Sequence, residues 1–382
     1  MLITRGMAEL ACLLPQDLSF DTATRLLGWQ VQETSVLSER TLRNLVLEHG
    51  KTVRKEEEAQ AKQLLARLKS PASENLQPNL TPIARAPRCR PGWPSELSKA
   101  VEETLSNPSP TPPAGVGFAD WERVLAVRRE EKELSVAQLR LLGPEIGTDQ
   151  VLVTTDEVLT RAPERRRFNE LRTARILTSE GTRYLSGRGA SFMLVLTAFV
   201  LLCAGRDRSV LLLADGARWI RNWFVEMSPQ ILVCQMILDW YHLCKKCREL
   251  CCMICKGRQA KKLLLNPLLK SLWNGQVDDA IMLLEGYREN ARNLEKLDEL
   301  IHYLRERRPY LVNYRERRKA RQYIGSGHVE KANDLIVAQR QKGSGMHWSE
   351  EMSDSLAALK TLMLNGGWDQ YWTQGKVMPL VA

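Results

Sequence analysis

The stretch Gln150–Leu159 reads QVLVTTDEVL, a run of Val, Leu and Thr that is typical of a β-strand. Asp156 lies near the end of this strand, and Glu157 follows it directly. Because side chains along a strand alternate between the two faces of a sheet, only one of these carboxylates faces a given site. The stretch therefore predicts one acidic side chain at the end of a largely buried strand.

The residues after this strand predict an α/β sheet. Two strands, an apolar helix and a short buried strand follow in the order 168–177, 182–185, 191–204 and 209–214. Three strands, a helix and a strand are the opening of a ribonuclease-H-like fold, in which the first and fourth strands lie side by side. Asp215 directly follows the fourth strand, so its carboxylate is expected to converge with that of Asp156.

A second informative stretch is Tyr323–Trp348, which reads YIGSGHVEKANDLIVAQRQKGSGMHW. Its Gly-Ser-Gly turn offers Ser326 as the N-cap of a helix, and glycines beside a cap let the backbone approach a ligand closely. Glu330 falls in the first turn of that helix, where a carboxylate is well placed for a metal ion. A capped surface helix with a solvated, charged face explains the same pattern. Three basic residues lie where a phosphate backbone can run, namely Arg340, Lys342 and His347.

Within this stretch, the patterns GSG-x-V-E and R-x-K-G-x-GM-x-W-S resemble the C-terminal signature of bacterial insertion-sequence transposases. The resemblance is greatest to the Kra-type family, and the Lre-type family is a more distant relative. The segment DGA-x-WI around Asp215 resembles the surroundings of that family's second catalytic aspartate. The resemblance implies an Asp-Asp-Glu triad that holds Mg²⁺ (or Mn²⁺) for DNA strand cleavage and strand transfer. Its members in this chain are Asp156, Asp215 and Glu330.

The sequence leaves alternatives to this triad open. In the family the first aspartate is usually followed by Gly, whereas Glu157 follows Asp156 here. One alternative is therefore a catalytically inactive, transposase-derived protein that only binds DNA. Another is a metal-dependent nuclease of the same fold. Asp334, one helical turn after Glu330, is the replacement ligand if Glu330 is not the third carboxylate.

A further candidate catalytic residue is His242. Residues 231–243 predict a fifth strand that runs into a helix, and their Asp239-x-x-His242 spacing resembles a signature of Mutator-like transposases. The resemblance implies that His242 lies near the metal site and contacts the scissile phosphate. The alternative is that Asp239 caps a helix and that His242 packs in the core, because a lone histidine usually has a structural role.

Residues 1–69 predict an all-helical DNA-binding region of the helix-turn-helix type. The second helix is expected over Ser38–Gly50, with Ser38 as its N-cap and Gly50 as its C-cap. An ordinary helical hairpin explains the same pattern. The side chains expected to contact DNA are Arg40, Arg43 and Asn44.

The remaining boundaries follow from composition. Residues 70–118 are rich in Pro and Ser, which predicts a linker. The ribonuclease-H-like core is expected over 119–240 and 322–382, with an all-helical insertion at 241–321. Five cysteines between 244 and 255 suggest zinc, but on one helix they are spread too far apart for a tetrahedral site. Their pattern favours structural thiols on an apolar helix face.

The overall composition favours a polyanionic partner. The chain has 382 residues, a net charge of +10 and a sequence pI of about 9.2, which suggests a polyanionic partner. The resemblance implies that this partner is double-stranded DNA, namely terminal inverted repeats and target DNA. Nine cysteines without a signal peptide favour reduced thiols in a cytoplasm, and the resemblance implies a bacterial, nucleoid-associated protein. The longest apolar run, 191–204, is too short to span a membrane. We also expect a homodimer or higher oligomer on DNA.

Overall fold

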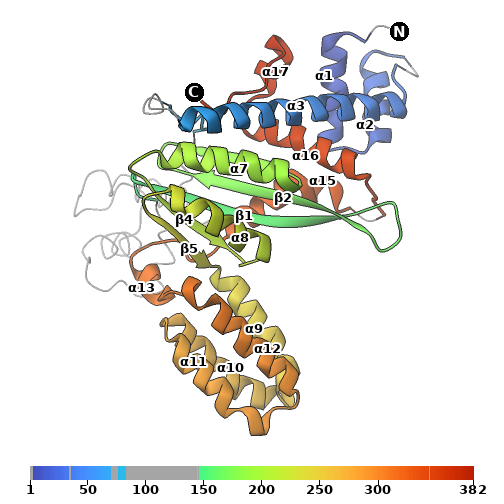
Figure 1. Cartoon of the computed structure of the whole chain (residues 1–382). Coiled ribbons are helices and arrows are strands. Elements are labelled where there is room, and N and C mark those ends of the chain that lie inside the picture. The colour runs from blue at the N-terminus through green and yellow to red at the C-terminus, as the bar shows by residue number, and fades with distance from the viewer. Residues whose placement is uncertain (1–2, 34–35, 70–75, 83–143, 145, 344) are drawn as a thin grey trace, which may run out of the picture. The chain divides into compact units, whose positions relative to one another are not determined.

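Figure 1 shows the computed structural model, which describes residues 3–33, 36–69, 76–82, 144, 146–343 and 345–382. These residues divide into two compact units. The first unit comprises the described residues within 1–82, 148–236 and 326–382, and the second consists mainly of 237–325. The predicted linker over 70–118 lies outside the described residues, except for 76–82.

The chain forms a mixed five-stranded sheet of β1 (Gln150–Arg161), β2 (Phe168–Leu177), β3 (Thr182–Gly187), β4 (Ser209–Ala214) and β5 (Cys234–Leu238). The strand order is β3-β2-β1-β4-β5. β1 is parallel to β4 and antiparallel to β2, and β2 is antiparallel to β3. The prediction that the first and fourth strands lie side by side is therefore confirmed, and the chain is an α/β protein.

β1 and β2 are longer than their outer neighbours. β4 pairs with residues 150–154 of β1, and β3 pairs with residues 172–177 of β2. The rest of the β1–β2 pair, as far as Arg161 and Phe168, forms a two-stranded ribbon that extends past both neighbours (Figure 1). A turn over residues 162–167 closes this hairpin.

Helices pack against the sheet in two groups. α7 (Gly189–Ala204) is apolar on almost every side, which is typical of a buried helix, and it contacts β1, β2 and β3. The second group contains α14 (Gly327–Asn333) and the π-type turn Asp334–Ala338 that continues it. Val158 of β1 and Leu171 of β2 share a hydrophobic core with this second group.

Helices from both ends of the chain complete the first unit. α3 (Glu39–Leu68) packs against both α7 and α16 (Glu350–Leu364). α3 and α16 share a hydrophobic core with residues of α1 (Arg5–Leu13), α2 (Phe20–Gln30) and α17 (Trp368–Gln374). The N-terminal helices and the sheet therefore belong to one compact unit rather than to separate ones.

α3 does not end at Gly50. The helix is continuous over 30 residues, so the predicted C-cap at Gly50 is wrong. A Cβ atom on Gly50 would lie 2.5 Å from the Cα atom of Ser355 in α16. Glycine is therefore needed here because two helices approach each other closely, and not because the chain turns.

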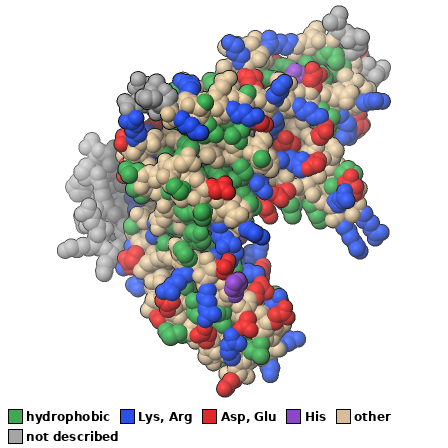
Figure 2. Space-filling model, in the orientation of Figure 1, with side chains coloured by type: hydrophobic (Ala, Val, Ile, Leu, Met, Phe, Trp, Pro, Cys, Tyr) green, Lys and Arg blue, Asp and Glu red, His purple; other side chains and the backbone are tan. Residues whose placement is uncertain are grey.

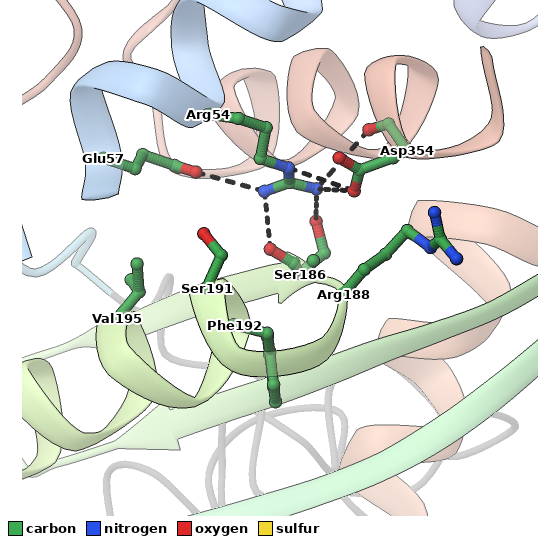
Figure 3. A pocket seen from close by; sticks show the side chains of 9 residues that line it. Arg54, Glu57, Ser186, Arg188, Ser191, Phe192, Val195 and Asp354 are labelled. Carbon is green, nitrogen blue, oxygen red and sulfur yellow. Dashed lines mark hydrogen bonds and ion pairs between the residues drawn. The ribbon is translucent and has the colours of Figure 1, made fainter. Parts of the chain in front are cut away.

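A buried charge cluster joins α3 to β3 and α16 (Figure 3). The Arg54 guanidinium donates hydrogen bonds to the Glu57 carboxylate at 3.1 Å and to Asp354 Oδ1 at 3.2 Å. It also donates to Ser186 Oγ at 2.8 Å, beside a cavity of about 160 Å³. Burial opposes the charge on Arg54, but the two carboxylates outweigh it and raise the pKa of Arg54. One arginine thus fixes the α3, β3 and α16 elements to one another.

The second unit is a helical bundle, described here by itself. Its helices are α9 (Trp240–Ile254), α10 (Gly257–Trp273), α11 (Val277–Gly286), α12 (Leu294–Arg307) and α13 (Tyr314–Lys319). α9 packs against α10 and α12, which both contact α11. Cys247 and Cys251 are buried on α9, and burial raises the pKa of both thiols. The unbroken helix and the buried thiols agree with the interpretation of these cysteines as structural.

Shorter elements connect these parts. α8 (Arg218–Met227) follows β4, and α15 (Gln339–Gln341) precedes the loop to α16. Single 3₁₀ turns occur at Leu14–Gln16, Ser228–Gln230, Arg288–Asn290 and Arg308–Tyr310. Within the described residues, every helix is too short or too polar to pass through a lipid bilayer.

Candidate active site

Asp156 is held by two hydrogen bonds. Its Oδ1 accepts from the Glu157 backbone N–H at 2.8 Å, and its Oδ2 accepts from Asn333 Nδ2 at 2.8 Å. The Thr173 hydroxyl of β2 donates a hydrogen bond to Oδ1 of the Asn333 side-chain amide. Asn333 therefore ties Asp156 to β2 and to the end of α14, which fixes the direction of the carboxylate.

Asp215 lies at the end of the strand next to that of Asp156. The last paired residues of β1 and β4 are Thr154 and Leu213. Asp156 lies two residues after Thr154, and Asp215 lies two residues after Leu213. The Asp215 Oδ1 accepts a hydrogen bond from the Ala217 backbone N–H at 2.8 Å, in the loop before α8. Asp215 therefore lies at the end of β4, whereas Asp156 lies within β1, where this strand extends past β4. The predicted position of Asp156 near the end of its strand is wrong, because pairing with β2 continues β1 to Arg161.

Glu157 points to the face of β1 opposite Asp156. Its carboxylate accepts a hydrogen bond from Trp219 Nε1 of α8 at 3.2 Å. Burial raises the pKa of Glu157, and the nearby Glu170 and Asp215 carboxylates raise it further. Arg172 stacks over the Trp219 ring at 4.4 Å. Glu157 is thus part of a second polar group near Asp215.

Glu330 is exposed in the first turn of α14, and Ser326 occupies the predicted N-cap position. Asp334, the replacement ligand, forms an ion pair with Lys331 at 2.8 Å. Among the described residues, no three or more His, Cys, Asp or Glu side chains are grouped so that they can hold a metal ion. The structure thus places Asp156 and Asp215 at corresponding levels of the neighbouring strands β1 and β4, but it does not group Glu330 with them. The side chains of Asp156, Asp215 and Glu330 are of a type that binds Mg²⁺, because each offers carboxylate oxygens.

His242 belongs to the second unit. Asp239 is the N-cap of α9, and its Oδ1 accepts from the His242 backbone N–H at 2.7 Å. The His242 ring nitrogen Nδ1 lies 3.3 Å from the same oxygen. This arrangement agrees with the alternative that Asp239 caps a helix.

The residues predicted to bind DNA differ in their exposure. Arg40, Asn44, Lys342 and His347 are exposed. Arg43 is also exposed, but it forms an ion pair with Glu39 and lies over the Phe20 ring at 4.4 Å.

Arg340, in contrast, is buried. Its Nε donates to the Pro15 carbonyl oxygen at 2.6 Å, and its guanidinium lies 4.6 Å from the Trp348 ring centroid. Burial, helped by the nearby Arg43 charge, lowers the pKa of Arg340 to about 10. Its guanidinium is therefore held inside the first unit and is not presented to DNA. There it donates a hydrogen bond to a backbone carbonyl oxygen and makes a cation–π contact with an aromatic ring.

His328 lies between Ser326 and Glu330 and has an unusual environment. Arg175 of β2 donates a hydrogen bond from Nη1 to the ring nitrogen Nδ1 at 2.6 Å, which requires a neutral ring. Burial and the Arg175 charge together lower the pKa of His328 to about 4. The ring thus connects the first turn of α14 to the sheet only while it is unprotonated.

This environment predicts a pH dependence of stability. The unfolded chain, with a histidine pKa of about 6.5, binds a proton more readily than the folded chain, so stability falls as the pH falls from about 6.5 to about 4. In urea unfolding across this window, wild type is expected to lose more free energy of unfolding than His328→Gln. Equal losses in the two proteins would contradict the assignment of a neutral, buried ring.

Comparison with models of known protein families finds no match for this chain, and a search of curated proteins finds no significant relative. The interpretation of the site therefore depends on the chain's own residues. The most informative residue that the sequence analysis missed is Asn333. Its position three residues after Glu330, on the same side of a helix, was the available signal.

Proposed function

We propose that the chain is a DDE transposase of the bacterial insertion-sequence type, with a ribonuclease-H-like core. The observation that carries this proposal is that Asp215 directly follows β4 and that Asp156 lies at the corresponding level of the neighbouring parallel strand β1. The DGA-x-WI and GSG-x-V-E patterns support it, because they occur in that family around the second and third acids. The strand order β3-β2-β1-β4-β5 is consistent with such a core, and the helical unit between β5 and α14 takes the place of the predicted insertion.

In this proposal, the carboxylates of Asp156, Asp215 and Glu330 hold Mg²⁺ or Mn²⁺. When bound, such ions activate the attacking oxygen and stabilise the leaving oxygen in a displacement at phosphorus. Asn333 keeps the Asp156 carboxylate oriented, which is the task of a positioning residue.

The partners follow from the same proposal. The substrate is double-stranded DNA carrying terminal inverted repeats, which is then joined to target DNA by a dimer or higher oligomer in the bacterial cytoplasm. Arg40, Asn44, Lys342 and His347 are exposed and are the predicted contacts that remain free to meet phosphates.

A second candidate function is DNA binding without cleavage. It is favoured by one observation, that Glu330 is not grouped with the two aspartates in the described structure. The two candidates differ in what the purified chain does to DNA that carries the element's ends. A plasmid nicking assay with Mg²⁺ or with EDTA is therefore the decisive experiment.

The proposed transposase is expected to convert the supercoiled plasmid to the nicked form with Mg²⁺ and to leave it intact with EDTA. A plasmid without the terminal repeats is the control and is expected to react much more slowly. Tight binding to the repeats without any nicking in Mg²⁺ or Mn²⁺ would overturn the transposase proposal in favour of the DNA-binding one.

A further inference from the structure

The hairpin between β1 and β2 ends in a concentrated positive charge. Residues 161–168 read RAPERRRF, with four arginines and one glutamate. Arg165, Arg166 and Arg167 are all exposed, and in the described part of the chain none of them forms a salt bridge. Figure 2 shows basic side chains gathered where Figure 1 places the end of this hairpin. Such unpaired charge favours a polyanionic partner.

The turn itself is well defined. The Ala162 N–H donates to the Arg167 carbonyl oxygen at 3.0 Å, and the Arg167 N–H donates to the Glu164 carbonyl oxygen at 3.1 Å. Arg166 has a φ of 64°, in the left-handed region. These bonds hold the three arginines on a short turn, so binding a partner orders little additional backbone.

One face of the ribbon is braced by the C-terminal segment. The Trp348 N–H donates to the Arg161 carbonyl oxygen at 2.9 Å, and Asn169 Nδ2 donates to the Trp348 carbonyl oxygen at 2.7 Å. His347, which is exposed, precedes Trp348 directly and therefore lies next to the hairpin. The transposase-like C-terminal pattern thus supports the base of the basic hairpin.

The other face of the ribbon is open. Leu159 is 45% exposed and Phe168 is 58% exposed, and the register places Phe168 opposite Arg161. A face that combines an arginine with exposed apolar side chains suits DNA, whose phosphates are charged and whose major groove also presents the apolar thymine methyl group. A two-stranded ribbon is also one of the elements that the major groove of DNA admits.

We propose that this hairpin is a DNA-binding arm, in which Arg165, Arg166 and Arg167 contact the phosphates of a duplex. Arginine suits this role because its planar guanidinium donates two parallel hydrogen bonds to a phosphate. The choice of duplex DNA as the partner rests on the proposed function. The arm adds a contact surface that is separate from the carboxylates, so it can be tested by binding alone.

The test is the binding of the full chain to a fluorescein-labelled DNA duplex of about two helical turns, measured by fluorescence anisotropy. The variant is Arg165→Ala/Arg166→Ala/Arg167→Ala. At about 150 mM salt, its affinity is expected to be about 10- to 100-fold weaker than that of wild type, because three phosphate contacts are lost. The slope of log K against log salt is expected to decrease by about 2 to 3.

A matched control removes the same charge elsewhere. Arg25, Lys51 and Lys62 are exposed and already paired with carboxylates, so Arg25→Ala/Lys51→Ala/Lys62→Ala is expected to bind DNA nearly as wild type does. A thermal melt followed by circular dichroism shows whether both variants remain folded.

Three results would contradict the proposal that the hairpin binds DNA. The hairpin variant could bind DNA with wild-type affinity, or the control variant could lose as much DNA affinity. The hairpin variant could also lose affinity for anionic phosphatidylserine vesicles but not for DNA. Plasmid nicking by the hairpin variant at saturating DNA separates the two proposals. If nicking with Mg²⁺ persists while DNA affinity is unchanged, the arm is wrong and the proposed function stands. If the hairpin variant loses DNA affinity and wild type does not nick the plasmid, the DNA-binding role of the hairpin is supported and the proposed catalysis is not.

Discussion

Arg54→Met is expected to lower the free energy of unfolding by about 3–5 kcal/mol, a large part of the 5–15 kcal/mol typical of a folded domain. The substitution keeps most of the apolar side chain but removes the cation that Glu57 and Asp354 share. Their carboxylates are only 8% and 23% exposed, so water cannot replace the lost partner. Urea unfolding followed by circular dichroism measures this loss.

The Arg54 prediction has an internal control in the double variant Arg54→Met/Glu57→Gln. Removing the buried carboxylate together with the cation is expected to restore part of the lost stability. Burial already raises the pKa of Glu57, so without Arg54 this carboxyl takes up a proton at mildly acidic pH. The loss in free energy of unfolding of Arg54→Met, relative to wild type, is therefore expected to grow as the pH rises. A deficit that is the same in the single and double variants would contradict the cluster's role.

Gly50→Ala is expected to destabilise the first unit by about 1–3 kcal/mol, although alanine usually stabilises a helix interior. The new methyl group would lie 2.4 Å from Ser355 Cβ and 2.8 Å from the Ser355 carbonyl oxygen. Since backbone atoms cannot yield as a flexible side chain does, α3 and α16 have to move apart. The change in thermal midpoint measures the effect.

Gly6→Ala is the matched control for Gly50→Ala. Gly6 lies in α1, and a Cβ atom there meets nothing within 4 Å. Alanine at this position is therefore expected to raise stability by about 0.5–1 kcal/mol, the ordinary helix preference. If both substitutions stabilise the protein, the claim that α3 and α16 are too close at Gly50 to accept a side chain is wrong.

The sequence predicts the sheet well because its strands carry their own signals. Gln150–Leu159 has the composition of a strand, and Asp215 follows a short apolar run, so both elements are visible locally. The sequence misses what depends on distant partners. Gly50 looks like a helix end because its close neighbour, Ser355, lies near the other end of the chain.

The site residues follow the same division. The neighbouring positions of Asp156 and Asp215 are predictable, because parallel pairing of β1 and β4 places them at the same level of the sheet. Arg340 looks like a surface cation, and only the folded chain shows the Pro15 carbonyl and the Trp348 ring that receive it. Asn333 lies one helical turn after Glu330, but its partners Thr173 and Asp156 are 160 and 177 residues away in the chain, so only the folded structure shows its role.

The central claim is that Asp156, Asp215 and Glu330 act together with divalent ions on a DNA phosphodiester. The most direct test is the single-turnover rate of nicking, with Mg²⁺, of DNA that carries the element's ends. Asp215→Asn is expected to slow this reaction by about 10³-fold or more, since the ions supply several kcal/mol, while DNA affinity remains at the wild-type level. Asp207→Asn, at an exposed turn before β4, is the matched control and is expected to react as wild type does. Equal nicking rates for Asp215→Asn and wild type would contradict the proposed active site.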